Sequence, residues 1–119
     1  MRPDAREAGY LQDMMQHARG VIRAVEGRRL EDYEADEELR LAVERRVEII
    51  GEAAAKVSEA FKEAHPEVPW RKIVGQRNVL AHEYGEIDDE IMWDVATVSI
   101  PELLRMLEVI MPKGRGEGG

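Results

Sequence analysis

Four polar side chains whose types could do chemistry lie within the stretch RNVLAHEYG, residues 77–85: Arg77, Asn78, His82 and Tyr84. Histidine titrates near neutral pH and can give or take a proton. Arginine carries a permanent positive charge, and its planar guanidinium matches the oxygens of a phosphate. Together they could cleave a phosphodiester, with arginine stabilising the charge on phosphorus while histidine moves the proton. On RNA the nucleophile is already present as the 2′-hydroxyl, so this chemistry would need no metal ion and no cofactor.

The spacing of these residues limits how they can meet on a helix. At about 100° per residue, Arg77 and Tyr84 share one face, and Asn78 and His82 share a neighbouring face. Arg77 and His82 diverge by about 140°, so they cannot both point straight at one phosphate from an unbroken helix. Three arrangements remain open: the helix distorts near His82, long side chains reach round it, or two chains meet in a symmetric dimer. Residue types alone do not separate catalysis from ordinary packing.

The composition indicates one soluble domain. The chain has 119 residues, of which 44% are hydrophobic and 35% are charged, and it contains no cysteine. Disulfides and thiolate metal sites are therefore excluded. No apolar run is long enough to cross a membrane, and the first ten residues do not resemble a signal peptide. We expect a cytoplasmic protein with no membrane partner.

The net charge argues against general nucleic-acid binding. Lys and Arg number 17 against 25 for Asp and Glu, giving a net charge of -8, whereas proteins that bind nucleic acids are usually basic. Between residues 70 and 84, however, the charged residues are Arg71, Lys72, Arg77 and Glu83, so this segment is net positive. Arg71 and Lys72 could contact RNA, or they could lie on a solvated face.

Helical spacing of apolar residues runs through the first half of the chain. Asp4 is suited to cap a first helix, and Gly27 to end it. The charged connection after Gly27 could include a helical turn of its own. Asp36 can cap a second long helix, which we expect to run to about His65, because Pro66 follows. In that helix Gly51 and neighbouring alanines would let another backbone come close.

The second half continues the helical pattern. A third helix begins near Trp70 and carries the 77–85 stretch, and Gly85 is suited to break it. Asp88 caps the last helix. Pro101 should kink that helix, because it has no N–H to bond the carbonyl of Thr97. The sequence thus predicts an all-α, four-to-five-helix up-and-down bundle over residues 1–112, followed by a disordered tail over residues 113–119.

Other candidate side chains have structural interpretations. Trp70 and Trp93 are flanked by apolar residues at helical spacing, which is typical of core or interface anchors. His17 and His65 lack partners at ligand spacing, so we interpret both as surface residues. The apolar face of the second helix is wider than one four-helix core needs, which favours a homodimer.

The segment Arg77–Tyr84 matches the Arg-x4-His-x-Tyr pattern of the HEPN superfamily. The flanking blocks RRVEIIGEAAAKVSE (45–59), VPWRKIVGQRN (68–78) and GEIDDEIMWDV (85–95) resemble its HepT-like toxin branch. The resemblance extends from about Tyr10 to Met111, and the blocks occur in the family's order.

The resemblance implies an all-α homodimer in which Arg77 and His82 of both chains line a cleft. Many members of the family are metal-independent ribonucleases that act as toxins, so RNA and not DNA is the expected substrate. Their gene neighbours encode a minimal nucleotidyltransferase antitoxin, which neutralises the toxin by binding or by transferring AMP to the motif tyrosine. By position, Arg77 and His82 would be catalytic, Asn78 supporting, and Tyr84 the AMP acceptor. The alternative is a helical dimer that binds a nucleotide or a partner protein without cleaving anything.

Overall fold

The computed structural model describes residues 3–82 and 87–111, and the side chains of residues 3–80 and 87–111. The described chain is α-helical and contains no strand in these ranges, so the all-α prediction is confirmed. The elements, in chain order, are α1 (Ala5–Val25), α2 (Leu30–Ala35), α3 (Glu37–Lys56), α4 (Glu59–Ala64), α5 (Trp70–His82), α6 (Asp89–Asp94), the π-helical turn η2 (Val95–Ser99) and α7 (Ile100–Ile110). The predicted break at Gly85 and the predicted tail over residues 113–119 lie outside the described residues.

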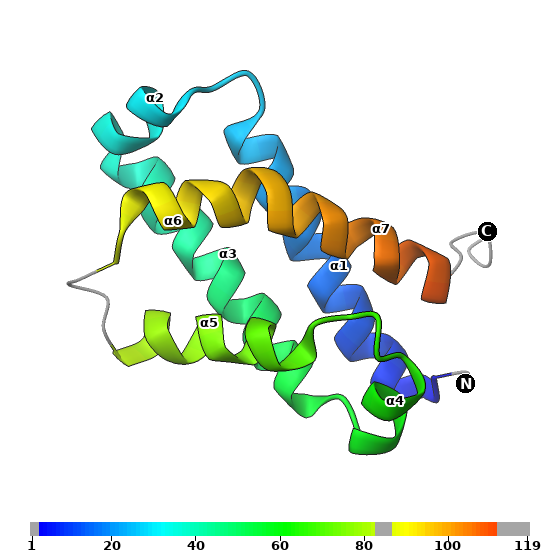
Figure 1. Ribbon diagram of the computed structural model, residues 1–119. Coiled ribbons are helices and arrows are strands. Elements are labelled where there is room, and N and C mark those ends of the chain that lie inside the picture. The colour runs from blue at the N-terminus through cyan, green and yellow to red at the C-terminus, as the bar shows by residue number, and fades with distance from the viewer. Residues whose placement is uncertain (1–2, 83–86, 112–119) are drawn as a thin grey trace.

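The long helices form a bundle in which α5 and the unit α6–η2–α7 cross in front of α1 and α3 (Figure 1). The helix α1 packs against both α3 and α7, whereas α5 packs mainly against α3. The core between them is made of apolar side chains at helical spacing. Its fully buried members include Leu11, Met14, Val21, Tyr33, Val43, Ile50, Phe61 and Leu107.

The helix starts predicted from local sequence are confirmed. The carboxylate of Asp4 accepts the N–H of Glu7 at 2.8 Å, and that of Asp36 accepts the N–H of Leu39 at 3.1 Å. Asp88 likewise accepts the N–H groups at the start of α6. These bonds satisfy backbone donors that have no partner inside the helix. At the other end of α1, Gly27 has a φ of 75°, a conformation that costs a glycine little.

The predicted second helix is divided in two, so its expected end at about His65 is wrong. The helix α3 ends at Lys56, and α4 begins at Glu59. Ser58 separates them, because its hydroxyl accepts the N–H of Phe61 at 3.1 Å while its own N–H donates to the carboxylate of Glu7 at 3.0 Å. A side chain from α1 thus takes a backbone donor that would otherwise extend α3.

Pro101 directly follows a π-turn, so the helix departs from α geometry just before this residue and not by the simple kink predicted. It lies in the first turn of α7, directly after η2, where the N–H of Ile100 bonds the carbonyl of Val95 five residues earlier. The wider π-turn therefore precedes the residue that lacks an N–H. None of the helices described here is a candidate to span a bilayer.

The two tryptophans pack against the core as predicted, whereas the two histidines are less exposed than the surface interpretation implied. Trp70 is buried, and Trp93 packs beside Tyr33 with ring centroids 5.4 Å apart. His17 and His65 are both partly buried. The ring of His65 packs 4.4 Å from that of Phe61, and Nδ1 of His17 lies 3.0 Å from Nη1 of Arg46.

Candidate active site

The side chain of Arg77 starts on the face of α5 that lies against α3. Its first carbon packs against Gly51 of α3, and the side chain as a whole is half-buried. Nε of Arg77 is buried and has no hydrogen-bond partner among the described residues. Nη1 donates to Oδ1 of Asn78 at 3.1 Å, and Asn78 is exposed. The stem of the arginine is therefore packed between two helices, while its charged end turns toward the face of α5 that carries Asn78.

The path of the Arg77 side chain favours one of the three arrangements that the spacing of Arg77 and His82 left open. The helix α5 continues without a break to His82, so no distortion precedes that residue. Instead the long arginine side chain reaches round to Asn78, and the backbone of His82 lies one turn further along on nearly the same face. The structure thus brings Arg77 and Asn78 together. The side chain of His82 and the whole of Tyr84 lie outside the described residues, so their roles stay predictions.

The charge of Arg77 is not neutralised by a neighbouring carboxylate. Other arginines form ion pairs, for example Arg45 with Glu48 at 3.2 Å. Among the residues whose side chains are described, no carboxylate pairs with Arg77. Its guanidinium can therefore offer its remaining N–H donors to an anion from outside, and a phosphate is the anion whose oxygens suit this planar fork.

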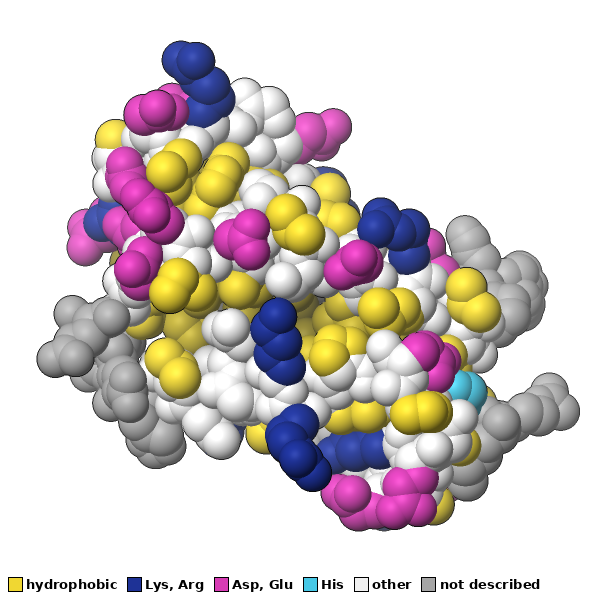
Figure 2. Space-filling model, in the orientation of Figure 1, with side chains coloured by type: hydrophobic (Ala, Val, Ile, Leu, Met, Phe, Trp, Pro, Cys, Tyr) yellow, Lys and Arg dark blue, Asp and Glu magenta, His cyan; other side chains and the backbone are white. Residues whose placement is uncertain are grey.

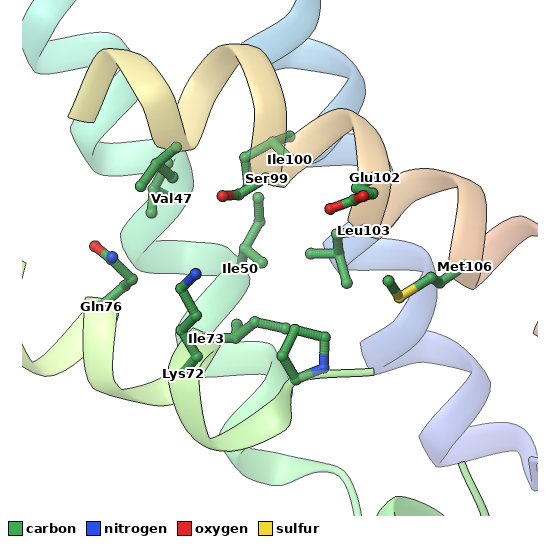
Figure 3. Close-up of a pocket in the computed structure, with 12 residues that line it drawn as sticks. Val47, Ile50, Lys72, Ile73, Gln76, Ser99, Ile100, Glu102, Leu103 and Met106 are labelled. Atoms are coloured by element: carbon green, nitrogen blue, oxygen red, sulfur yellow. The ribbon is translucent and has the colours of Figure 1, made fainter. Parts of the chain in front are cut away.

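The two other basic candidates lie on different sides of α5. Arg71 is exposed and lies seven residues before Asn78, which places both on one face. Lys72 is also exposed, but it extends from α5 into the space between α5 and α7 (Figure 3). Of the two, only Arg71 shares the face to which the Arg77 guanidinium turns.

A groove that the sequence analysis missed runs between α5 and the α6–η2–α7 unit. Its cavity is about 90 Å³, and Figure 2 shows apolar side chains on its floor. The lining is mainly apolar, with polar groups at the rims: Val47, Ile50, Pro69, Lys72, Ile73, Gln76, Val95, Ser99, Ile100, Glu102, Leu103 and Met106. Gln76 and Asn78 are about 160° apart on α5. The groove and the Arg77–Asn78 pair therefore lie on opposite sides of the helix.

A second group of titratable side chains lies where α2, α3 and α6 meet. Burial raises the pKa of the Tyr33 phenol, and its hydroxyl has no hydrogen-bond partner among the described residues. Burial also raises the pKa of Glu44, the nearby carboxylate of Asp89 raises it further, and Arg40 partly opposes them. On α1, burial lowers the pKa of His17, and the positive charge of Arg46 lowers it further. None of these groups belongs to α5, so we assign them no part in the candidate site.

Comparison with known proteins identifies the family. The model of the family described as "Ribonuclease HepT-like" matches residues 14–110. A protein named "Putative RNase" from Caldanaerobacter subterraneus subsp. tengcongensis is 38% identical over 104 residues, covering 87% of this chain and 93% of the relative. One of the same name from Methanocaldococcus jannaschii is 33% identical and covers 85% of this chain and 93% of the relative. "Probable ribonuclease HepT" from Thermococcus cleftensis is 40% identical over 73 residues, which are 61% of this chain and 66% of the relative. No solved structure matches the chain.

These matches, together with the all-α bundle and the arginine on α5, define the class of protein as a helical ribonuclease of the HEPN superfamily. Within that class, the chain belongs to the HepT-like family. The resemblance stated from the sequence is therefore confirmed, and so is the predicted kind of enzyme.

Proposed function

We propose that this protein is an endoribonuclease that works without a metal ion, with Arg77 and His82 as its catalytic residues and Asn78 in support. The observation that carries the proposal is the path of Arg77. Its guanidinium bonds to Asn78 and pairs with no described carboxylate, and His82 lies on the same helix one turn after Asn78. An arginine that pairs with no described carboxylate can stabilise the charge on a phosphate, and a histidine on the same helix can supply the proton transfer.

The proposed reaction is an internal transfer on RNA. The ribose 2′-oxygen forms a bond to phosphorus, and the bond from phosphorus to the 5′-oxygen of the next nucleotide breaks. His82 takes part in moving the proton between the 2′-hydroxyl and the departing 5′-oxygen. Arg77 stabilises the negative charge on the phosphorus oxygens, and Asn78 holds the guanidinium in place. The products are a 2′,3′-cyclic phosphate and a free 5′-hydroxyl.

We further propose that the enzyme is the toxin of a toxin–antitoxin pair, acting as a homodimer. Its antitoxin would be a minimal nucleotidyltransferase that neutralises it by binding, by AMP transfer to Tyr84, or by both. The intact Arg77–Tyr84 motif and the family membership support this proposal. An AMP group on Tyr84 would bring a negative phosphate to a site whose arginine pairs with no described carboxylate.

The test is incubation of the purified protein with total RNA, with and without EDTA. We expect cleavage in both cases, with cyclic phosphate at the new 3′ ends. The variant His82→Ala should lower the rate by roughly 10²–10⁴, which is the usual contribution of a general acid or base. His17→Ala is the matched control, because His17 lies on α1 and should leave cleavage unchanged.

Two outcomes would count against this mechanism. Undiminished cleavage by His82→Ala would show that His82 does not carry the proton. Loss of cleavage in EDTA would show that a metal ion takes part. Binding of RNA or nucleotide without any cleavage would instead favour the non-catalytic helical dimer.

A further inference from the structure

Gly51 lies in the C-terminal half of α3, is buried, and faces α5. A Cβ atom at this position would lie 2.2 Å from Cβ of Arg77, and 3.0 Å from both Cγ of Arg77 and the carbonyl oxygen of Ile73. Real Cβ atoms essentially never come within 3.0 Å of a heavy atom outside their own stretch of chain. At this point, therefore, the two helices are in contact at a separation that only a glycine permits.

The atoms that face Gly51 cannot easily move away. One is a backbone carbonyl of α5, and another is the first side-chain carbon of Arg77, which is fixed to the backbone of the same helix. Gly20 of α1 offers a comparison, because a Cβ there would meet the guanidinium at the end of Arg46, which can rotate. A side chain at Gly51 would have to push α5 itself away from α3.

We propose that Gly51 is a positioning residue for Arg77: it lets the arginine stem lie against α3, so that the guanidinium emerges beside Asn78. This inference rests on the proposed role of Arg77 in RNA cleavage. Independent support comes from Nε of Arg77, which is buried without a described partner, while only the end of the group reaches Asn78. How deeply the Arg77 side chain lies between α3 and α5 thus determines how far its guanidinium extends beyond the two helices.

In this proposal, catalysis requires accurate placement of the Arg77 guanidinium. Arg77 would act on charge that develops at phosphorus, so its position matters most in the transition state. A misplacement of about 1 Å can cost a reaction on the order of 10²-fold. Gly51 touches no substrate in this proposal and acts only through Arg77.

The first experiment compares Gly51→Ala with Gly75→Ala in cleavage of a short RNA. Gly75 is the matched control, because it lies on α5 and a Cβ there would meet no atom within 4 Å. We expect Gly51→Ala to lower kcat on the order of 10²-fold, with a much smaller change in KM, and Gly75→Ala to leave both unchanged. Equal kcat values for the two variants would overturn the proposal.

The second experiment needs no activity and measures melting temperatures in a double-mutant cycle. Gly51→Ala should lower the melting temperature in the wild-type background, because alanine clashes with Cβ of Arg77. In an Arg77→Gly background the nearest clashing carbon is gone and only the Ile73 carbonyl oxygen, at 3.0 Å, remains. The same change should therefore cost much less, and the higher helix propensity of alanine should offset part of that cost. An equal loss in both backgrounds would overturn the proposal, because the obstacle would then not be Arg77.

The two experiments also separate this inference from the proposed function. If the wild-type protein cleaves no RNA, the proposed function fails, and the melting-temperature cycle still decides whether Gly51 sets the place of Arg77. If Gly51→Ala alone does not fold, recovery of a folded protein in Gly51→Ala/Arg77→Gly supports the proposal. Failure to recover, while Arg77→Gly alone folds, overturns it.

Discussion

At the scale of single residues, the side-chain amide of Asn78 holds the guanidinium of Arg77 in place. The arginine stem leaves α5 on the side that faces α3, and its end bonds to Oδ1 of Asn78 on the exposed side. The NH₂ group of Asn78 donates to none of the described residues, so it can donate to a ligand. An anion held by Arg77 would therefore have a neutral donor beside it.

Tyr84 is the residue on which the proposed regulation depends. Tyr84→Phe removes the acceptor oxygen and keeps the ring, so we expect it to retain much of the ribonuclease activity and to escape AMP transfer by the cognate nucleotidyltransferase with ATP. Mass spectrometry after co-expression with the neighbouring gene would detect an adduct of AMP mass on the wild type but not on the variant. Tyr10→Phe on α1 is the control, and it should still be modified. An unmodified but inhibited wild type would mean that neutralisation works by binding alone.

Glu44 gives a prediction about stability and pH. Burial, followed by the charge of Asp89, raises its pKa in the folded protein above the ordinary value of 4.5. The folded state thus prefers the protonated form, so the free energy of unfolding falls as the pH rises from about 4.5 through the raised pKa. Glu44→Gln stays neutral and should melt at a higher temperature than the wild type near neutral pH, with a smaller difference in acid.

The control for that measurement is Glu38→Gln, an exposed position on the same helix. It should show no such pH-dependent gain. A lower melting temperature for Glu44→Gln at neutral pH would mean that the carboxylate stabilises the fold through Arg40 more than burial and Asp89 destabilise it.

At the scale of helices, the sequence predicts well what depends on neighbouring residues. Asp4, Asp36 and Asp88 cap helices through bonds to N–H groups two or three residues away, so their roles are visible in local sequence. The division at Ser58 is not, because the carboxylate that binds its N–H comes from Glu7, on another helix. The spacing of Arg77 and His82 likewise left three arrangements open, since the path of the arginine depends on the distant Gly51.

Ser58 should be important for the start of α4. Ser58→Ala removes the hydroxyl that accepts the N–H of Phe61, and loss of such a cap usually costs about 0.5–2 kcal/mol of stability. Urea denaturation should show a loss in this range. Ser99→Ala is the control, because Ser99 precedes α7 without making a side-chain capping bond. Equal stability of Ser58→Ala and the wild type would show that the bond to Glu7 alone maintains the division.

At the scale of the whole molecule, we predict a homodimer. The family resemblance favours two chains at the site. Light scattering at micromolar concentration should give twice the chain mass of 13.6 kDa. A mass of one chain at that concentration would contradict the prediction and would require a single protomer to supply the whole site.

The packing of α5 mainly against α3 has a consequence for how heat inactivates the enzyme. The helix that carries Arg77 packs mainly against α3, whereas α1 joins α3 and α7 into one body. Opening α5 alone therefore breaks fewer contacts than unfolding the whole bundle, so it should require less free energy. On warming, the enzyme would lose its catalytic geometry before it loses its fold, and on cooling it would regain activity without having to refold from the unfolded chain.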